Sequence, residues 1–300
     1  MIIANQLPCD PAPPAAGVID LETLAQGGRV PVLPPGTTRL LSMLTDETLK
    51  FEDLAAVVGG FPTVAARLLA VANSPWSAPV APIESLEMAC ARLGMETVRS
   101  ISIAVTVSAP FNSLRCPVFD AKRYWCSALL VADTAPQIVQ RLRSASPIEI
   151  PAARTAGLLH NLGLLWLADC LPIQTAQALV AVADNENLSV NQALRACCGF
   201  GHNEASIALA RAWNLPPVLR AGMAYHDPKD GDPAALMMAR VIAVAAGMVA
   251  LLYHGAAVPA HPAFGRIDVD ATALDAIYEQ LRGNFNKRQK LAEALMPRRI

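Results

Sequence analysis

Residues 152–170, AARTAGLLHNLGLLWLADC, form the stretch that decides the fold of this chain. From Ala156 to Ala168 the stretch has no charged residue and is almost entirely apolar. Apolar residues occupy every face of a helical projection rather than one stripe, which predicts a single helix buried on all sides. The exception is a polar pair in the middle, His160 and Asn161. Because a polar side chain is costly to bury without a hydrogen bond or a ligand, this pair is the first candidate for function.

Length and composition indicate a protein with a large hydrophobic core. The 300 residues are 53% hydrophobic and 16% charged, which allows one large domain or two smaller ones. The formal net charge is −1 and basic residues gather only near the C-terminal end, so we expect no surface that neutralises nucleic-acid phosphates. The seven cysteines form no Cys-x-x-Cys pair, which predicts reduced, buried thiols in a cytoplasmic protein.

Neither the N-terminal end nor the most apolar run of the sequence is typical of a membrane segment. The first ten residues lack the basic and apolar regions of a signal peptide. The strongly apolar run 241–253 is too short to span a bilayer and predicts a core helix. We therefore expect a cytoplasmic protein without membrane contact.

Apolar residues recur at helical spacing from Thr37 to the C-terminal region, and no stretch shows the alternation and hairpin turns of strands. The pattern predicts an all-α fold. Residues 1–28, rich in Pro, Ala and Gly, predict a loose N-terminal extension. The predicted helices cover residues 38–44, 50–58, 62–72, 83–93, 96–107, 119–142, 152–170, 173–184, 189–198, 203–213, 217–226, 234–253 and 271–295.

Several short motifs occur in an order and spacing that resemble the HDOD proteins. These proteins contain the HD-related output domain of bacterial signalling, a relative of the HD-domain phosphohydrolases. The resemblance extends over about residues 31–227. The motifs are Leu33-Pro-Pro, Phe61-Pro62, Arg67-Leu-Leu, Ala72-Asn-Ser74, Pro82-Ile-Glu-Ser-Leu86, Leu93-Gly94, Gly157-Leu-Leu-His-Asn-Leu-Gly163, Gly201-His-Asn-Glu204, Trp213-Asn-Leu-Pro216 and Tyr225-His226.

The resemblance implies a division of the chain into subdomains. An N-terminal helical subdomain, about residues 29–117, would pack on an HD-like helical subdomain, about residues 118–233. Residues 234–300 would then form a C-terminal helical extension. The chain departs from the family pattern at Gly59-Gly60, where an acidic residue commonly precedes the proline.

The resemblance also implies a degenerate HD-like pocket. An HD enzyme needs an early histidine, an adjacent His-Asp pair and later histidines or aspartates. Carboxylates and imidazoles suit Mg²⁺, Mn²⁺ or Fe ions, which activate water and neutralise phosphate. Here Asn161 stands in the place of the aspartate beside His160, and Ser127 stands at the early histidine position. His202 and His226 occupy places where the enzymes often have histidines.

These replacements predict a pocket without catalytic residues, metal or cofactor. We expect His160 to be a hydrogen-bonded core residue, and Asn161 to be satisfied by Ser127 or by a backbone carbonyl. We expect His202 to cap its helix or to face solvent, and His226 to end a helix. Three tryptophans are predicted to pack in the core: Trp125, Trp166 and Trp213.

The predicted function is that of a non-catalytic regulatory or scaffold module, not an enzyme. Its expected partners are signalling proteins, such as response regulators or cyclic-dinucleotide enzymes. Two alternatives stay open, a metal-dependent phosphohydrolase and a nucleotide-binding protein that uses the residual pocket. The basic residues near the C-terminus are either a contact element or, as we prefer, the solvated end of a packed helical lid: Lys287, Arg288, Lys290, Arg298 and Arg299.

Overall fold

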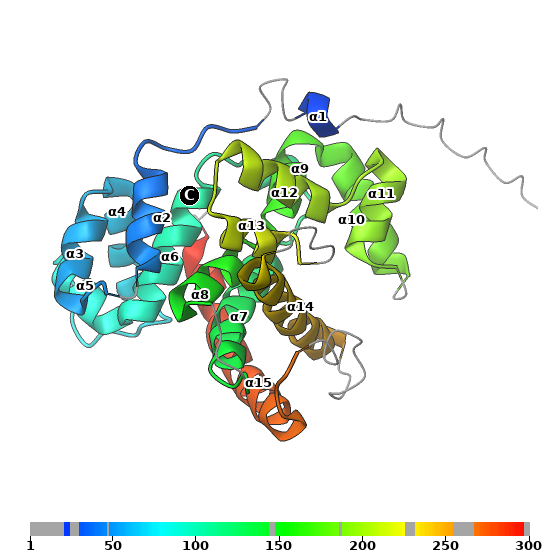
Figure 1. Cartoon of the computed structure of the whole chain (residues 1–300). Helices are drawn as coiled ribbons and strands as arrows, with labels where there is room; N and C mark the ends of the chain where they lie inside the picture. Colours follow the sequence, from blue (N-terminus) through cyan, green and yellow to red (C-terminus); the bar gives the residue numbers. More distant parts are fainter. Residues whose placement is uncertain are drawn as a thin grey trace, which may run out of the picture.

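All secondary structure elements of the described residues are helices, as predicted (Figure 1). The computed structural model describes residues 21–24, 30–46, 48–143, 148–185, 188–225, 232–254 and 267–296. The predictions for residues 1–20, for His226 and for Arg298 and Arg299 lie outside these residues.

The N-terminal helices form one group, drawn in blue and cyan in Figure 1. Their apolar residues turn inward at the predicted spacing; Leu40, Leu41 and Leu44 are all buried. Gly94 ends one helix and precedes the next at φ 79°, a backbone conformation that favours glycine. The helices of this group are α2 (Thr37–Thr45), α3 (Phe51–Gly59), α4 (Pro62–Ala72), α5 (Leu86–Leu93) and α6 (Met95–Ser108), whereas the short α1 (Leu21–Leu24) lies apart from them, against α12.

Helices α7 and α8 pack together, with α14 against both, α13 against α8 and α15 against α7, whereas α9 to α12 pack mainly on one another (Figure 1). Gly157 of α8 lies so close to α7 that a Cβ atom there would be 2.9 Å from the backbone of Ala132. A 3₁₀ turn, Ser113–Arg115, precedes α7. The helices are α7 (Ala121–Val139), α8 (Ile150–Leu159), α9 (Leu162–Cys170), α10 (Pro172–Asp184), α11 (Val190–Cys198), α12 (His202–Ala212), α13 (Pro217–Met223), α14 (Pro233–His254) and α15 (Ala271–Leu295).

The prediction of one continuous helix over residues 152–170 is wrong. The stretch forms α8 and α9, and the chain leaves the helical conformation at Asn161, with φ −109° and ψ 18°. The two helices pack on different neighbours: α8 contacts α7 and α13, whereas α9 contacts α12. Apolar spacing does not reveal such a break, because both helices are apolar on nearly every face.

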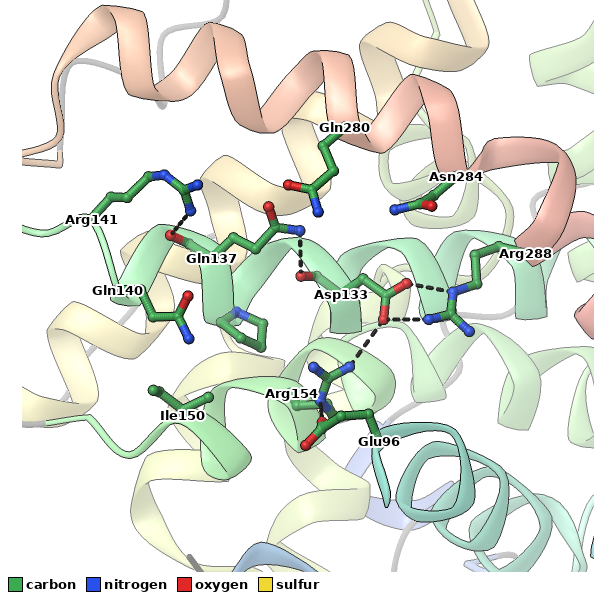
Figure 2. A pocket seen from close by; sticks show the side chains of 11 residues that line it. Glu96, Asp133, Gln137, Gln140, Arg141, Ile150, Arg154, Gln280, Asn284 and Arg288 are labelled. Carbon is green, nitrogen blue, oxygen red and sulfur yellow. Dashed lines mark hydrogen bonds and ion pairs between the residues drawn. The ribbon is translucent and has the colours of Figure 1, made fainter. Parts of the chain in front are cut away.

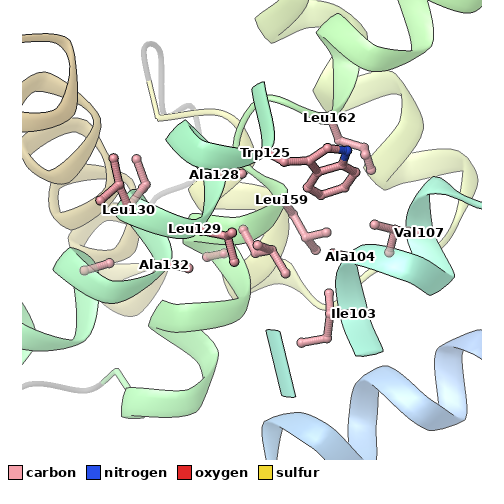
Figure 3. Packing of buried hydrophobic residues seen from close by; sticks show 14 of the residues in the cluster. Ile103, Ala104, Val107, Trp125, Ala128, Leu129, Leu130, Ala132, Leu159 and Leu162 are labelled. Atoms are coloured by element: carbon pink, nitrogen blue, oxygen red, sulfur yellow. The ribbon is translucent and has the colours of Figure 1, made fainter. Parts of the chain in front are cut away.

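Figure 3 shows how the break joins the N-terminal group to the centre of the fold. Leu159 and Leu162 flank the break and belong to the same buried cluster as Ile103 and Val107 of α6. Trp125 of α7 is buried in this cluster, and the prediction that Trp166 and Trp213 are core residues is confirmed too. The six cysteines of the described residues are free thiols, buried at Cys90, Cys116, Cys126 and Cys198.

Helix α14 is longer than the apolar run noticed in the sequence. The segment Pro233–Tyr253 has 21 residues, and its most apolar 18-residue window has a mean hydropathy of 2.2, sufficient by length and composition alone to cross a membrane. In this fold, 56% of its most apolar window is buried, against α7, α8 and α13. The prediction of a core helix is therefore consistent with its packing, although its length gives no argument against a bilayer.

Helix α15 runs along α7 and returns to the N-terminal group (Figure 1). The indole Nε1 of Trp76, just after α4, donates a hydrogen bond to the carbonyl of Lys287 at 3.0 Å. Arg67 of α4 donates to the carbonyl of Met296 at 3.4 Å. One buried cluster extends from Leu24 to Leu295, so the three-part division at residues 117 and 233 stays a prediction.

Candidate functional site

His160 lies directly after α8 and is only 1% exposed. Its Nδ1 lies 2.7 Å from the carbonyl oxygen of Gly157. Because a carbonyl only accepts, Nδ1 carries the proton, and a neutral ring then has its acceptor at Nε2. The predicted buried, hydrogen-bonded histidine is therefore present.

The ring of His160 packs edge-on against Tyr225, with ring centroids 5.7 Å apart. Burial raises the pKa of the Tyr225 phenol well above its ordinary value, so this side chain stays protonated at any physiological pH. Tyr225 follows α13, so its contact with His160 connects the break between α8 and α9 to the segment after α13.

Asn161 precedes α9 and is half-buried. Its Oδ1 atom is buried without a hydrogen-bond partner in the described part of the chain. Ser127, which lies half-buried on α7, therefore donates no hydrogen bond to this oxygen, and the prediction that Ser127 or a backbone carbonyl satisfies Asn161 does not hold for Oδ1. A buried acceptor without a partner costs about 1–3 kcal/mol, so the break retains an unfavourable polar atom.

His202 is the first residue of α12 and is buried at 7% exposure, and the N-cap of this helix is Gly201, so the prediction that His202 caps its helix or faces solvent is wrong. Close packing of α9 on α12 explains this burial. The Gly163 N–H donates to Ser206 Oγ at 2.9 Å, and this hydroxyl donates to the carbonyl of His202 at 2.9 Å. The tertiary structure thus brings the helix break against the first turn of α12.

The residues at the break do not fit the metal site of an HD enzyme. The neutral amide of Asn161 is a poorer ligand than a carboxylate for a hard cation such as Mg²⁺. In the part of the chain that the structure describes, no three His, Cys, Asp or Glu side chains are grouped closely enough to hold a metal ion. His226 lies outside that part.

A second candidate site lies elsewhere, in a cavity of about 540 Å³ that is open to solvent and lined by α6, α7, α8 and α15 (Figure 2). The sequence pattern did not predict it. Its lining comes from polar faces of four separate helices, each of which alone is typical of a solvated helix surface. The lining residues are Glu96, Asp133, Pro136, Gln137, Gln140, Arg141, Ile150, Arg154, Gln280, Asn284 and Arg288.

The carboxylate of Asp133 is the centre of an ion-pair cluster at this cavity (Figure 2). Arg288 of α15 binds it through Nε and Nη2, the latter at 2.9 Å, and Arg154 of α8 binds it through Nη1 at 3.0 Å. Arg154 also pairs with Glu96 of α6. The prediction that Arg288 belongs to a solvated basic end is wrong, because its side chain is only 15% exposed.

Comparison with known proteins agrees with this architecture. The model of the HDOD domain family matches residues 30–228. No curated protein is significantly similar to this chain. An HDOD domain protein of unknown function from Geobacter sulfurreducens has a TM-score of 0.66 at 22% identity, with 92% of this chain and 99% of that chain covered.

Two further solved structures are similar in fold. A protein from Marinobacter aquaeolei VT8, provisionally named a signal transduction protein, has a TM-score of 0.76 at 20% identity over 94% of this chain. This chain spans only 63% of that protein's length. A protein from Shewanella amazonensis SB2B, provisionally named a phosphohydrolase, has a TM-score of 0.66 at 24% identity, with 92% of this chain and 98% of that chain covered. At these identities the likeness shows the fold alone.

Proposed function

This chain belongs to the HDOD domain family, and from that premise we propose that it is a non-catalytic regulatory module of bacterial signal transduction. It acts in the cytoplasm through contacts with other proteins. The observation that carries the proposal is the donor set at the break between α8 and α9. Asn161 supplies an amide in the place where the family's enzymatic relatives have a carboxylate.

The chemistry of that replacement supports a loss of catalysis. A divalent cation in a dry pocket needs carboxylate charge to offset its own, and an amide oxygen has none. Ser127, at the early histidine position, is a half-buried hydroxyl and likewise a poor ligand. The buried His160 is then best explained as a core residue whose hydrogen bond to Gly157 stabilises the end of α8.

A hydrolysis assay tests the absence of catalysis. The purified chain is incubated with bis(p-nitrophenyl) phosphate and with cyclic dinucleotides in the presence of Mn²⁺, Mg²⁺ or Fe²⁺. We expect no turnover above that of the same protein with EDTA. Metal-dependent turnover that is lost in both His160→Ala and His202→Ala, with circular dichroism showing that the variants are folded, would contradict the proposal and favour a phosphohydrolase.

The proposed partners are signalling proteins, with response regulators and cyclic-dinucleotide enzymes as the expected classes. Cross-linking in cells, followed by mass spectrometry, identifies the proteins that contact the chain. We expect such a protein among those enriched, and we expect the purified pair to form a complex in size-exclusion chromatography. Enrichment of chaperones alone, with no complex from any purified candidate, would count against a scaffold role.

A further inference from the structure

Helix α10 has a composition that does not match its exposure to solvent. Its 13 residues, PIQTAQALVAVAD, include one charged side chain, that of Asp184 at the last position. A helix without polar charge on any face is normally buried. Here only Thr175 and Ala178 are buried, and α10 packs on its neighbours α9 and α11 (Figure 1). One side of an almost uncharged helix therefore lies open within the described part of the chain.

The exposed side of α10 has the spacing of a helix contact face. Ile173, Gln177, Val180 and Asp184 are all exposed and follow one another at intervals of four, three and four residues. Residues at these intervals lie on one face of a helix, and the same spacing recurs where two helices pack along each other. The apolar members are well exposed, with Ile173 at 69% and Val180 at 47%. We call these four residues the α10 stripe.

The charge distribution of α10 favours an antiparallel copy of itself as the partner. Asp184 lies at the C-terminal end of the helix, where the helix dipole disfavours an anion. The first turn, which begins at Pro172, contains no acidic residue, and the N–H groups of a first turn attract negative charge. In an antiparallel pair each Asp184 lies beside the first turn of the other α10. The rest of the α10 stripe is uncharged, so two copies meet there without repulsion between like charges.

We propose that two copies of this chain associate through the α10 stripe, with the two helices antiparallel about a two-fold axis. A two-fold interface uses the same surface on both copies, as the charges of α10 require. Removal of Ile173 and Val180 from water supplies the main stabilisation. The face of one 13-residue helix is smaller than the roughly 800 Å² per partner of a stable interface, so the dimer is weak and depends on concentration. The proposal does not depend on the proposed function.

Sedimentation equilibrium of the full chain tests the association. The protein is measured from about 5 to 500 μM, a range suited to the micromolar affinity of a small interface. We expect the average mass to rise from that of one chain toward that of two as the concentration increases. A chain that stays monomeric over the whole range would overturn the proposal and leave the α10 stripe to a helix of another protein.

Two substitutions in the α10 stripe locate the interface. Ile173→Glu and Val180→Glu change exposed side chains, so the melting temperature of the dilute protein is expected to stay the same. In the dimer each change takes two carboxylates out of water, so the dissociation constant rises by at least about tenfold. Met88→Glu is the matched control, because Met88 is an apolar residue of α5 that is 56% exposed. A dimer that persists in both α10 variants, or that Met88→Glu also dissociates, would overturn the proposal.

Asp184→Lys tests the antiparallel orientation. A lysine at the C-terminal end of α10 interacts favourably with the dipole of its own helix, so the melting temperature of the dilute protein is expected to stay the same or to rise. In the dimer the same lysine lies beside the first turn of the other α10, at two symmetric positions. The dissociation constant therefore rises about tenfold. A dimer that Asp184→Lys leaves unchanged or strengthens would contradict the antiparallel pairing.

Discussion

Gly163 determines how closely α9 approaches α12. A Cβ atom at this position would lie 2.2 Å from the carbonyl oxygen of His202 and 2.4 Å from the backbone nitrogen of Ser206. Both atoms belong to the backbone, so the neighbour cannot yield by a change of side-chain rotamer. The hydrogen bond from the Gly163 N–H to Ser206 Oγ needs the same close approach. The absence of a Cβ atom at Gly163 therefore allows the break between α8 and α9 to pack against the first turn of α12.

We expect Gly163→Ala to destabilise the protein by about 3 kcal/mol, because overpacking against backbone atoms forces the two helices apart. Urea unfolding followed by circular dichroism measures the change from the shift of the midpoint. Gly283→Ala in α15 is the matched control, since nothing lies within 4 Å of the position that its new Cβ would take and the residue is exposed. This control is expected to stabilise by about 0.5–1 kcal/mol through helix propensity. A neutral Gly163→Ala would show that α9 and α12 are further apart than described.

At the scale of the element, α15 is held to the rest of the fold by groups of different kinds. Arg288 binds Asp133 of α7, and the backbone carbonyl of Lys287 accepts from Trp76 beside α4. Leu274, Ile277 and Leu281 are buried against the core. The predicted packed lid is therefore present, but its basic residue Arg288 points inward to an acidic partner.

We expect Asp133→Asn to destabilise the protein by about 2–4 kcal/mol. The change leaves two guanidinium groups, 13% and 15% exposed, without the carboxylate that both bind. Glu279→Gln is the control on α15, because its partner Arg282 and the glutamate are 57% and 66% exposed and such a pair contributes little. Urea unfolding of both variants compares the two costs. Similar costs would mean that the Asp133 cluster has no special part in holding α15.

The start of α15 has a pH-dependent contribution to stability. The Arg143 guanidinium, and after it the Thr272 backbone N–H and hydroxyl, lower the pKa of the Asp270 carboxyl below its ordinary value. A carboxyl whose pKa is lower in the folded state stabilises the fold above its unfolded pKa, near 3.9, and this contribution is lost as the pH falls through the folded pKa.

We therefore expect the difference in urea midpoint between wild type and Asp270→Asn to be constant above about pH 5 and to shrink as the pH falls below about 4. Titration of the Asp270 carboxyl by nuclear magnetic resonance measures its pKa directly. Arg143→Ala should raise this pKa, because it removes the largest cause of the shift. A midpoint difference independent of pH from about 3 to 6 would contradict the assignment.

At the scale of the whole molecule, the N-terminal group, the central helices and α15 share one buried cluster. Trp125 and Leu159 of the centre lie beside Ile103 of α6 in this cluster (Figure 3). The Asp133 cavity also draws side chains from all three parts of the chain. Such continuity favours cooperative unfolding over independent opening of subdomains.

Hydrogen exchange measured by mass spectrometry tests this cooperativity. We expect the most protected peptides of α4, α7 and α15 to exchange with the same free energy of opening, because none of the three can lose its buried face alone. In Asp133→Asn the values of all three peptides should fall together. An α4 with a much lower opening energy than α7 in the wild type would instead show two units that unfold separately.

The sequence by itself determined the helical class, nearly every helix and the family. Apolar residues at intervals of three and four indicated the buried face of each helix. The helix predicted over residues 271–295 coincides with the observed α15. Composition also indicated the buried tryptophans, and the resemblance placed Asn161 where the enzymatic relatives have a carboxylate. These are local properties, since each depends on residues that lie within a few positions of one another.

Only the tertiary structure decided the break at His160 and Asn161, the burial of His202 and the cavity around Asp133. A stretch that is apolar on all faces carries no periodic signal to distinguish one helix from two, and the contact of Gly163 with α12 selects two. Asp133, Arg154 and Arg288 lie on three helices, and each is typical of a solvated surface until those helices pack. The spacing of residues along the chain does not indicate which side chains of distant helices form ion pairs, so only the structure identifies these contacts.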